Sequence, residues 1–143
     1  MGTFSFGKRS SDNLSGAHFS LKKVCQKALS YGVMDFSVIE GHRSIERQNQ
    51  LFEEGKSKLD GVTKKSKHNY TPSLAVDLLP YPPVVNGVNV WNDKQRFSVL
   101  AGLVMAAASE EGIMIRWGGD WDGDGNNADS SFHDLPHFEL LHA

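Results

Sequence analysis

The stretch Pro136-His137-Phe138-Glu139-Leu140-Leu141 decides how the C-terminal part of this chain folds. Its polar and apolar side chains alternate, which is typical of a β-strand with one face against a hydrophobic core. The two-residue period of a strand places His137, Glu139 and Leu141 on the same face. We therefore expect a strand over residues 137–141 that presents His137, with Glu139 beside it in a position to orient a ligand.

Helices and short strands are predicted along the rest of the chain in mixed order. Apolar residues over 21–29 recur at helical spacing, and Gly32 ends that helix. Further helices are expected from an N-cap at Ser44 to about residue 54, and from Asn92 or Asp93 to about residue 111. Short strands are expected over 36–39, 74–79 and 113–116, with a hairpin over 84–90 around Asn86-Gly87. This order predicts an α+β fold with a mainly antiparallel sheet flanked by about three helices.

The composition is that of an ordinary globular protein. With 143 residues, of which 39% are hydrophobic and 22% charged, the chain suits a single domain over residues 1–143. Its net charge of -2 gives no electrostatic case for a nucleic-acid partner. Residues 1–15 are polar, and no apolar run approaches the about 20 residues of a membrane span. We expect no signal peptide, no transmembrane segment and no stable membrane association, and a buried structural thiol at Cys25, the single cysteine.

Three residues in separate parts of the sequence are candidate metal ligands. Asp77 lies in the apolar stretch Ala75-Val76-Asp77-Leu78-Leu79, where a carboxylate is costly unless it is paired or bound to a cation. It is also the only acid between residues 61 and 92. With His68 and His137 it would supply two imidazole nitrogens and one carboxylate oxygen, a set that suits zinc. Three protein ligands leave the fourth position open for water, as hydrolytic zinc sites require.

The motifs Ser66-x-His68, Ala75-x-Asp77 and Asp134-x-x-His137-Phe138-Glu139 follow one another in a specific order. This order resembles the signature of the zinc D-alanyl-D-alanine carboxypeptidase and L-alanyl-D-glutamate endopeptidase family, which has the hedgehog/DD-peptidase fold. Gly41-His42-Arg43-Ser44, followed by Gln48, is similar to that family's upstream arginine motif. The opening Phe4-Ser5-Phe6-Gly7-Lys8 and the segment Arg116-Trp117-Gly118-Gly119-Asp120-Trp121 are most like phage endolysins of the L-alanyl-D-glutamate type.

The spacing of the first two ligands departs from that family. His68 and Asp77 are nine residues apart, about two more than is usual, and extra loop residues cost little closure entropy. The resemblance implies one catalytic zinc ion on the three ligands and a general base at Asp134, which would pass a proton from water to the leaving amine. Arg43 would hold a substrate carboxylate or a developing oxyanion, with a structural salt bridge as the alternative. Ser66 is expected to donate a hydrogen bond behind the ligands and not to act as a nucleophile.

Two further segments carry charge. Asp120-Trp121-Asp122-Gly123-Asp124-Gly125-Asn126 resembles the start of a calcium loop, but Ser131 replaces the glutamate that would complete it. Asp120, Asp122 and Asp124 are therefore candidate ligands of a regulatory calcium ion, with a solvated turn as the alternative. Residues 56–67 form a basic loop with five lysines. It is either simply solvated or makes a weak contact with anionic cell-wall polymer.

The resemblance implies a zinc metallopeptidase that hydrolyses the L-alanyl-D-glutamate bond of peptidoglycan stem peptides during host-cell lysis. Such an endolysin is expected to be a monomer that stays in the host bacterial cytoplasm until it is released to the cell wall. The nearest alternative is a D-alanyl-D-alanine carboxypeptidase or dipeptidase that uses the same zinc chemistry. A non-catalytic zinc-binding domain on the same scaffold is a third reading, although Asp134 and Arg43 would then have no purpose.

Overall fold

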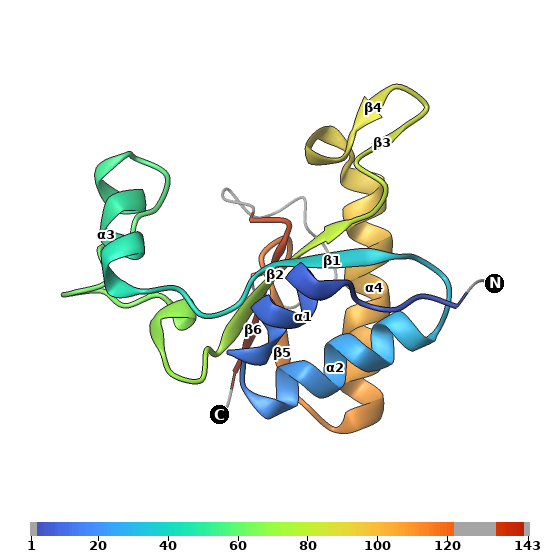
Figure 1. Cartoon of the computed structure of the whole chain (residues 1–143), viewed down its shortest axis with the longest axis horizontal. Coiled ribbons are helices and arrows are strands. Elements are labelled where there is room, and N and C mark those ends of the chain that lie inside the picture. Colours follow the sequence, from blue (N-terminus) through green and yellow to red (C-terminus); the bar gives the residue numbers. More distant parts are fainter. Residues whose placement is uncertain (1–2, 122–133, 142–143) are drawn as a thin grey trace.

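Four short strands form an antiparallel sheet at the centre of this computed structural model, which describes residues 3–121 and 134–141 (Figure 1). The strands are β1 (Phe36–Glu40), β2 (Ala75–Pro80), β5 (Ile115–Trp117) and β6 (His137–Leu140). Their order across the sheet is β1-β2-β6-β5, and each neighbouring pair is antiparallel. A separate hairpin joins β3 (Val84–Val85) to β4 (Val88–Asn89). The sheet order makes β2 and β6, the two strands with candidate ligands, direct neighbours.

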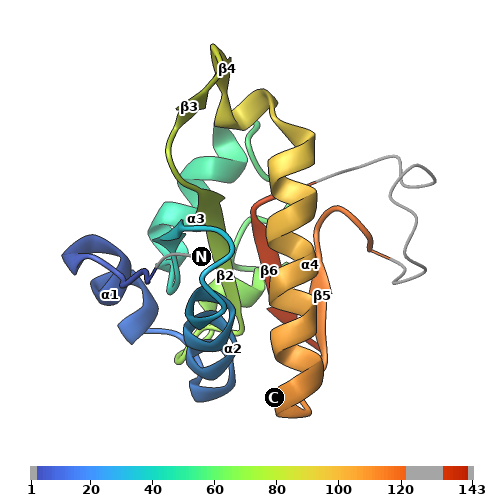
Figure 2. The same cartoon turned by 90° about the vertical axis from the view of Figure 1, so that its right-hand side faces the viewer.

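Among the described residues, four α-helices and two 3-10 turns complete the fold, which is a small α+β domain. They are α1 (Lys8–Ser15), α2 (Phe19–Ser30), α3 (Ile45–Glu53), α4 (Lys94–Glu111), η1 (Lys67–Asn69) and η2 (Val90–Asn92). Helices α2 and α4 lie together on one side of the sheet, and α3 lies at the opposite end of the molecule (Figure 1 and Figure 2). Within the described ranges, none of these helices has the length and apolar character needed to cross a membrane.

The alternation of side chains along the strands separates the hydrophobic core from the other face of the sheet. Val76 and Leu78 of β2 belong to the buried cluster that α2 and α4 complete, and so do Phe138 and Leu140 of β6. The intervening residues of both strands point to the opposite face because successive strand side chains alternate. That face carries the candidate ligands of β2 and β6.

Local signals placed several element ends correctly. The Ser44 hydroxyl accepts the backbone N–H of Arg47 at the start of α3, and Asp93 caps α4 in the same way. Asn86 and Gly87 both have positive φ, 50° and 77°, which confirms the type I′ turn of the hairpin. Cys25 is buried in α2, as expected.

Helix α1 adds an element that the sequence patterns did not indicate. Residues 8–15 are polar and lack an apolar stripe, and only Ser10 and Leu14 are buried. The helix is held instead by hydrogen bonds to β1, an edge strand: the Ser10 hydroxyl accepts the Val38 N–H at 3.0 Å, and Asn13 donates to the Val38 carbonyl at 2.8 Å. These contacts satisfy backbone groups on the side of β1 where the described part of the chain places no neighbouring strand.

Candidate active site

Asp77 and His137 lie directly opposite each other on β2 and β6. Side chains of such cross-strand partners point to the same face, with Cβ atoms about 4.5–5.5 Å apart. Nδ1 of His137 lies 3.2 Å from Oδ1 of Asp77. The antiparallel register therefore brings together two candidate ligands that are 60 residues apart in the sequence.

His68 reaches the same carboxylate from the turn η1. Its Nδ1–H donates to the carbonyl oxygen of Gly41 at 2.7 Å, which leaves Nε2 3.2 Å from Oδ1 of Asp77. The Ser66 hydroxyl caps the turn by accepting the backbone N–H of His68 at 3.2 Å, where the sequence suggested a donor. The long spacing between His68 and Asp77 thus does not keep the two side chains apart.

These three side chains form a group that could hold a metal ion. His68 Nε2, Asp77 Oδ1 and His137 Nδ1 face one another, and the group's ligand atoms lie within 4.8 Å. In a tetrahedral zinc site with bonds of about 2.0–2.2 Å, neighbouring donor atoms stand about 3.3–3.6 Å apart. The two 3.2 Å separations from Asp77 are close to that value. Two imidazoles and one carboxylate therefore fit such an ion and leave its remaining position open.

The charges in the group favour a cation. Burial opposes the ionisation of Asp77, but hydrogen bonds with His137 and His68 outweigh burial and hold the pKa of Asp77 below its usual range. Burial likewise lowers the pKa of His137, whereas hydrogen bonds with Asp77 and Glu139 raise that pKa to about 9. An ionised carboxylate between two imidazoles attracts a metal ion, which would displace the proton from His137.

Glu139 holds the His137 ring from the side away from Asp77. Nε2–H of His137 donates to Oε1 of Glu139 at 2.8 Å, and Oε2 accepts from Nη2 of Arg116 at 2.8 Å. Burial raises the pKa of Glu139, but its hydrogen bonds with His137 and Arg116 outweigh burial and lower that pKa to about 2. The hydrogen bond fixes the tautomer and orientation of His137, so that Nδ1 faces the other two ligands.

Arg43 lies on the other side of Asp77 and is fixed by its neighbours. Its Nη2 lies 3.6 Å from Oδ2 of Asp77, and its Nε donates to Oε1 of Glu40 at 2.9 Å. Nη1 donates to Oε1 of Gln48, a fully buried side chain, at 2.8 Å. Arg43 therefore forms an internal ion pair and lines the pocket at the same time.

Asp134 stands beside the ligand group in the segment that leads into β6. Its Oδ2 lies 4.0 Å from Nδ1 of His137. Its backbone N–H donates to the carbonyl oxygen of Gly118 at 2.8 Å, which anchors the segment to the end of β5. Burial and then the nearby charge of Asp77 raise the pKa of Asp134. A carboxyl group with a raised pKa next to a ligand group is suited to accepting a proton.

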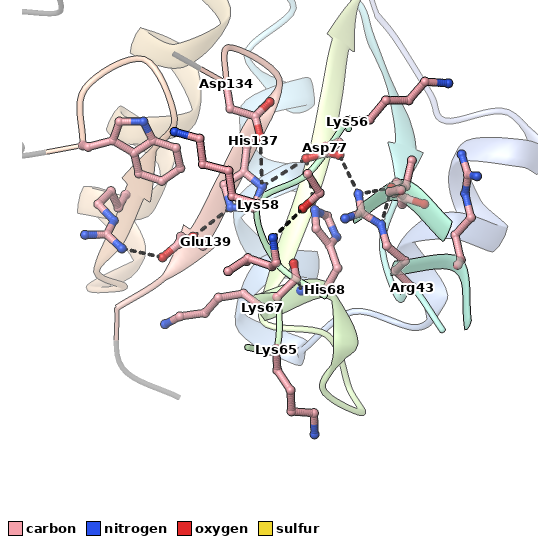
Figure 3. Close-up of a pocket in the computed structure, with 18 residues that line it drawn as sticks. Arg43, Lys56, Lys58, Lys65, Lys67, His68, Asp77, Asp134, His137 and Glu139 are labelled. Atoms are coloured by element: carbon pink, nitrogen blue, oxygen red, sulfur yellow. Dashed lines mark hydrogen bonds and ion pairs between the residues drawn. The ribbon is translucent and has the colours of Figure 1, made fainter. Parts of the chain in front are cut away.

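A pocket of about 540 Å³ lies over these residues (Figure 3). Its lining includes all three candidate ligands, Arg43 and Asp134. Both ends of the lysine loop, residues 56–67, also contribute to the wall. The site therefore combines three potential metal ligands, a potential general base and several positively charged side chains around one cavity.

Asp120 is the one candidate calcium ligand that lies within the described residues. Its backbone N–H donates to the Trp117 carbonyl at 3.1 Å. Asp122 and Asp124 lie outside the described residues, so calcium binding by this loop stays a prediction.

Two pocket residues were missed by sequence reasoning. Glu40 pairs with Arg43 and lies opposite Asp77 in the register of β1 and β2. Arg116 pairs with Glu139 from the neighbouring strand β5. The acid directly before the Gly41-His42-Arg43 motif was the one available signal for Glu40. The pairing of Arg116 with Glu139 depends on the register of β5 and β6, which could not be predicted from the sequence.

The fold and the site together define the class of this protein as a small α+β peptidase. The family model for phage L-alanyl-D-glutamate peptidases matches residues 1–141, and the chain belongs to this family. The L-alanyl-D-glutamate peptidase of Escherichia phage T5 is 32% identical over 142 residues, covering 97% of this chain and 99% of that protein. The crystal structure of the Serratia marcescens L-Ala D-Glu endopeptidase ChiX matches with a TM-score of 0.73 and 36% identity, over 96% of this chain and 90% of that one. The resemblance suggested by the motifs is confirmed.

Proposed function

We propose that this chain is a zinc-dependent endopeptidase that hydrolyses the L-alanyl-D-glutamate bond of peptidoglycan stem peptides. Its family and both relatives described above carry the name of this bond. One observation carries the proposal: the carboxylate of Asp134 stands 4.0 Å from His137, a member of the His68-Asp77-His137 group, in the same pocket. A purely structural zinc site would be closed by a fourth protein ligand and would need no such neighbour.

His68, Asp77 and His137 would hold the ion through the atoms that face one another. When bound there, zinc supplies Lewis acidity toward water and toward the scissile carbonyl oxygen. The protein contributes rigidity to the ligands. The Gly41 carbonyl fixes the His68 ring, and Glu139 fixes the His137 ring. Such supporting hydrogen bonds control ligand geometry and metal affinity.

Asp134 would act as the general base. Its Oδ2 can accept a proton from the attacking water and then deliver this proton to the nitrogen of the leaving amine. Asp134 is therefore unchanged at the end of the hydrolysis. Arg43, on the opposite side of Asp77, offers a guanidinium edge to negative charge on the substrate. The two residues thus flank the ligand group with complementary roles.

We also propose that the enzyme acts as a monomer, because the three candidate ligands, Asp134 and Arg43 line one pocket without a contribution from a second chain. Membership of a phage peptidase family supports accumulation in the host cytoplasm followed by release to the cell wall. The substrate partner would be the stem peptide of peptidoglycan.

Digestion of purified peptidoglycan by the zinc-loaded protein tests the proposed bond. Mass spectrometry of the fragments should find new N-terminal glutamyl ends and free C-terminal alanine on the part that carries the sugar. Release of single D-alanine residues alone would replace the proposal with a carboxypeptidase. Binding without any cleavage would favour the non-catalytic domain.

A further inference from the structure

The pocket carries far more positive charge than the rest of the chain. Four lysines and three arginines line it, against four acids, whereas the whole protein has 15 Lys and Arg residues and a net charge of -2. A divalent ion on the His-Asp-His group would increase this excess. Figure 3 shows Lys56, Lys58, Lys65 and Lys67 distributed around the ligand group and not gathered at one edge. A pocket of this kind favours a substrate with several negative charges.

The lysine loop is held in a defined shape. Gln48 anchors its first part, because its Nε2 donates to Oγ of Ser57 at 2.8 Å and to the Leu59 carbonyl at 2.7 Å. Gly61, at a φ of 84°, packs against the Gln48 side chain and leaves no room for a Cβ without displacement. The same Gln48 accepts a hydrogen bond from Arg43, so the loop and the guanidinium share one support.

Asp60 organises the tip of the loop. Its Oδ1 accepts the backbone N–H groups of Val62, Thr63 and Lys64, each at 2.9 Å, and its Oδ2 accepts the Thr63 hydroxyl at 2.6 Å. These hydrogen bonds hold the pKa of Asp60 well below its usual range. A loop with this internal bonding presents its lysines from a fixed backbone, which reduces the entropy cost of binding a ligand.

The four pocket lysines are not equivalent. Lys67 is half-buried and its Nζ donates to the Leu140 carbonyl at 2.7 Å, so it is committed to the fold. Lys56, Lys58 and Lys65 are exposed. Lys56 makes an exposed ion pair with Glu54 at 3.2 Å, and Lys65 lies over the Tyr70 ring at 4.8 Å. Exposed contacts of these kinds are weak and leave a lysine able to bind a carboxylate of the substrate.

We propose that Lys56, Lys58 and Lys65 form a carboxylate-binding rim that makes the enzyme selective for stem peptides with free carboxylates over amidated ones. This inference rests on the proposed function. Glutamate has two carboxyl groups and the peptide chain can continue through only one, so a free carboxylate lies on the residue next to the scissile bond. Conversion of that carboxylate to a carboxamide removes the charge without changing the shape. The rim would therefore bind the free-carboxylate form of the substrate more tightly than the carboxamide form.

Two synthetic stem peptides test this selectivity, one with a free glutamate carboxylate and one with the carboxamide. The zinc-loaded wild-type enzyme should have a kcat/KM about tenfold higher for the carboxylate peptide at low ionic strength, and added salt should shrink that ratio. The triple variant Lys56→Gln/Lys58→Gln/Lys65→Gln should lose most of the preference, because its kcat/KM should fall by a larger factor for the carboxylate peptide than for the carboxamide peptide. Lys64→Gln is the matched control, because Lys64 is an exposed lysine of the same loop outside the pocket lining.

The outcomes separate the two proposals. If neither peptide is cleaved, the proposed function is wrong. If both are cleaved at equal rates, or if the triple variant keeps the full preference, the carboxylate-binding rim is wrong and the peptidase assignment stands. An equal loss of kcat/KM on both peptides in the triple variant, with unchanged zinc content and circular dichroism, would also overturn the rim, because it would indicate a general effect on the site.

Discussion

The backbone N–H of Asp134 donates to the carbonyl oxygen of Gly118, and the Gly118 N–H in turn donates to the carbonyl oxygen of His137, both at 2.8 Å. Gly118 thus connects the proposed base to a candidate metal ligand. A Cβ at Gly118 would overlap the carbonyl group of Asp134. The glycine is therefore required by the close approach of these two backbone segments.

Gly118→Ala should lower kcat/KM by about 100-fold, because displacement of a catalytic group by about 1 Å has an effect of that order. Zinc content should remain near one ion per chain, since the three ligands are untouched. Steady-state kinetics and metal analysis on the same sample check this. Gly102→Ala is the control: nothing lies within 4 Å of a Cβ at this position in α4, so activity should be unchanged. Wild-type kinetics in Gly118→Ala would contradict the positioning role.

Asp134→Asn and His68→Ala should separate the base from the metal group. Asp134→Asn removes the proton acceptor and keeps all three ligands, so kcat should fall by about 10²–10⁴-fold with zinc retained. His68→Ala removes a ligand and should lose both zinc and activity. Zinc analysis by mass spectrometry, paired with peptide cleavage rates, distinguishes the two results. Full turnover by Asp134→Asn would show that another group takes the proton.

Glu139→Ala should weaken zinc binding by about 10–100-fold, because His137 would lose the carboxylate that orients its ring. Arg116 would also lose its partner. Glu139→Gln keeps an acceptor for the His137 N–H and should fall between the alanine variant and wild type. Competition with a chromophoric chelator measures the zinc affinity. Equal zinc affinity in all three proteins would show that Glu139 does not orient His137 for metal binding.

The thiol of Cys25 should make the free energy of unfolding depend on pH in alkaline solution. Burial raises the pKa of its thiol from the ordinary 9.0 to about 12. Because the folded-state pKa is raised, this contribution to stability is fully present below pH 9.0 and is lost as pH rises toward about 12. Within that window wild type should lose up to about 1.4 kcal/mol per pH unit more than Cys25→Ala.

Urea unfolding of both proteins at about pH 8 and about pH 10.5 measures the Cys25 effect, and the difference between them isolates the thiol from titrating lysines and tyrosines. A parallel pH dependence in the two proteins would mean that the thiol ionises as easily in the folded state as in the unfolded state.

Local sequence signals predicted the features that depend on neighbouring residues. Strand alternation predicted that His137 and Glu139 share one face. The pair Asn86-Gly87 predicted the type I′ turn of the hairpin. An acid in the apolar strand marked Asp77 as unusual. Each of these follows from the period of a strand or the backbone preference of a residue type.

Features that depend on contacts between distant segments were not predictable in this way. Helix α1 has no apolar stripe and is held to an edge strand by Ser10 and Asn13. Glu40 and Arg43 are three residues apart and pair locally, but the position of this pair beside Asp77 depends on the register of β1 and β2, which shifts between Val38 and Glu40. A single sequence does not specify such a register shift.

We expect peptide cleavage to require one zinc ion held by His68, Asp77 and His137. Metal-free protein, at a concentration well above its dissociation constant for zinc, should be titrated with zinc while cleavage of an L-alanyl-D-glutamate peptide is followed. We predict no activity at the start, a linear rise as zinc is added and a sharp plateau at one equivalent. Full activity of the metal-free protein, or a plateau only at two equivalents, would contradict this prediction.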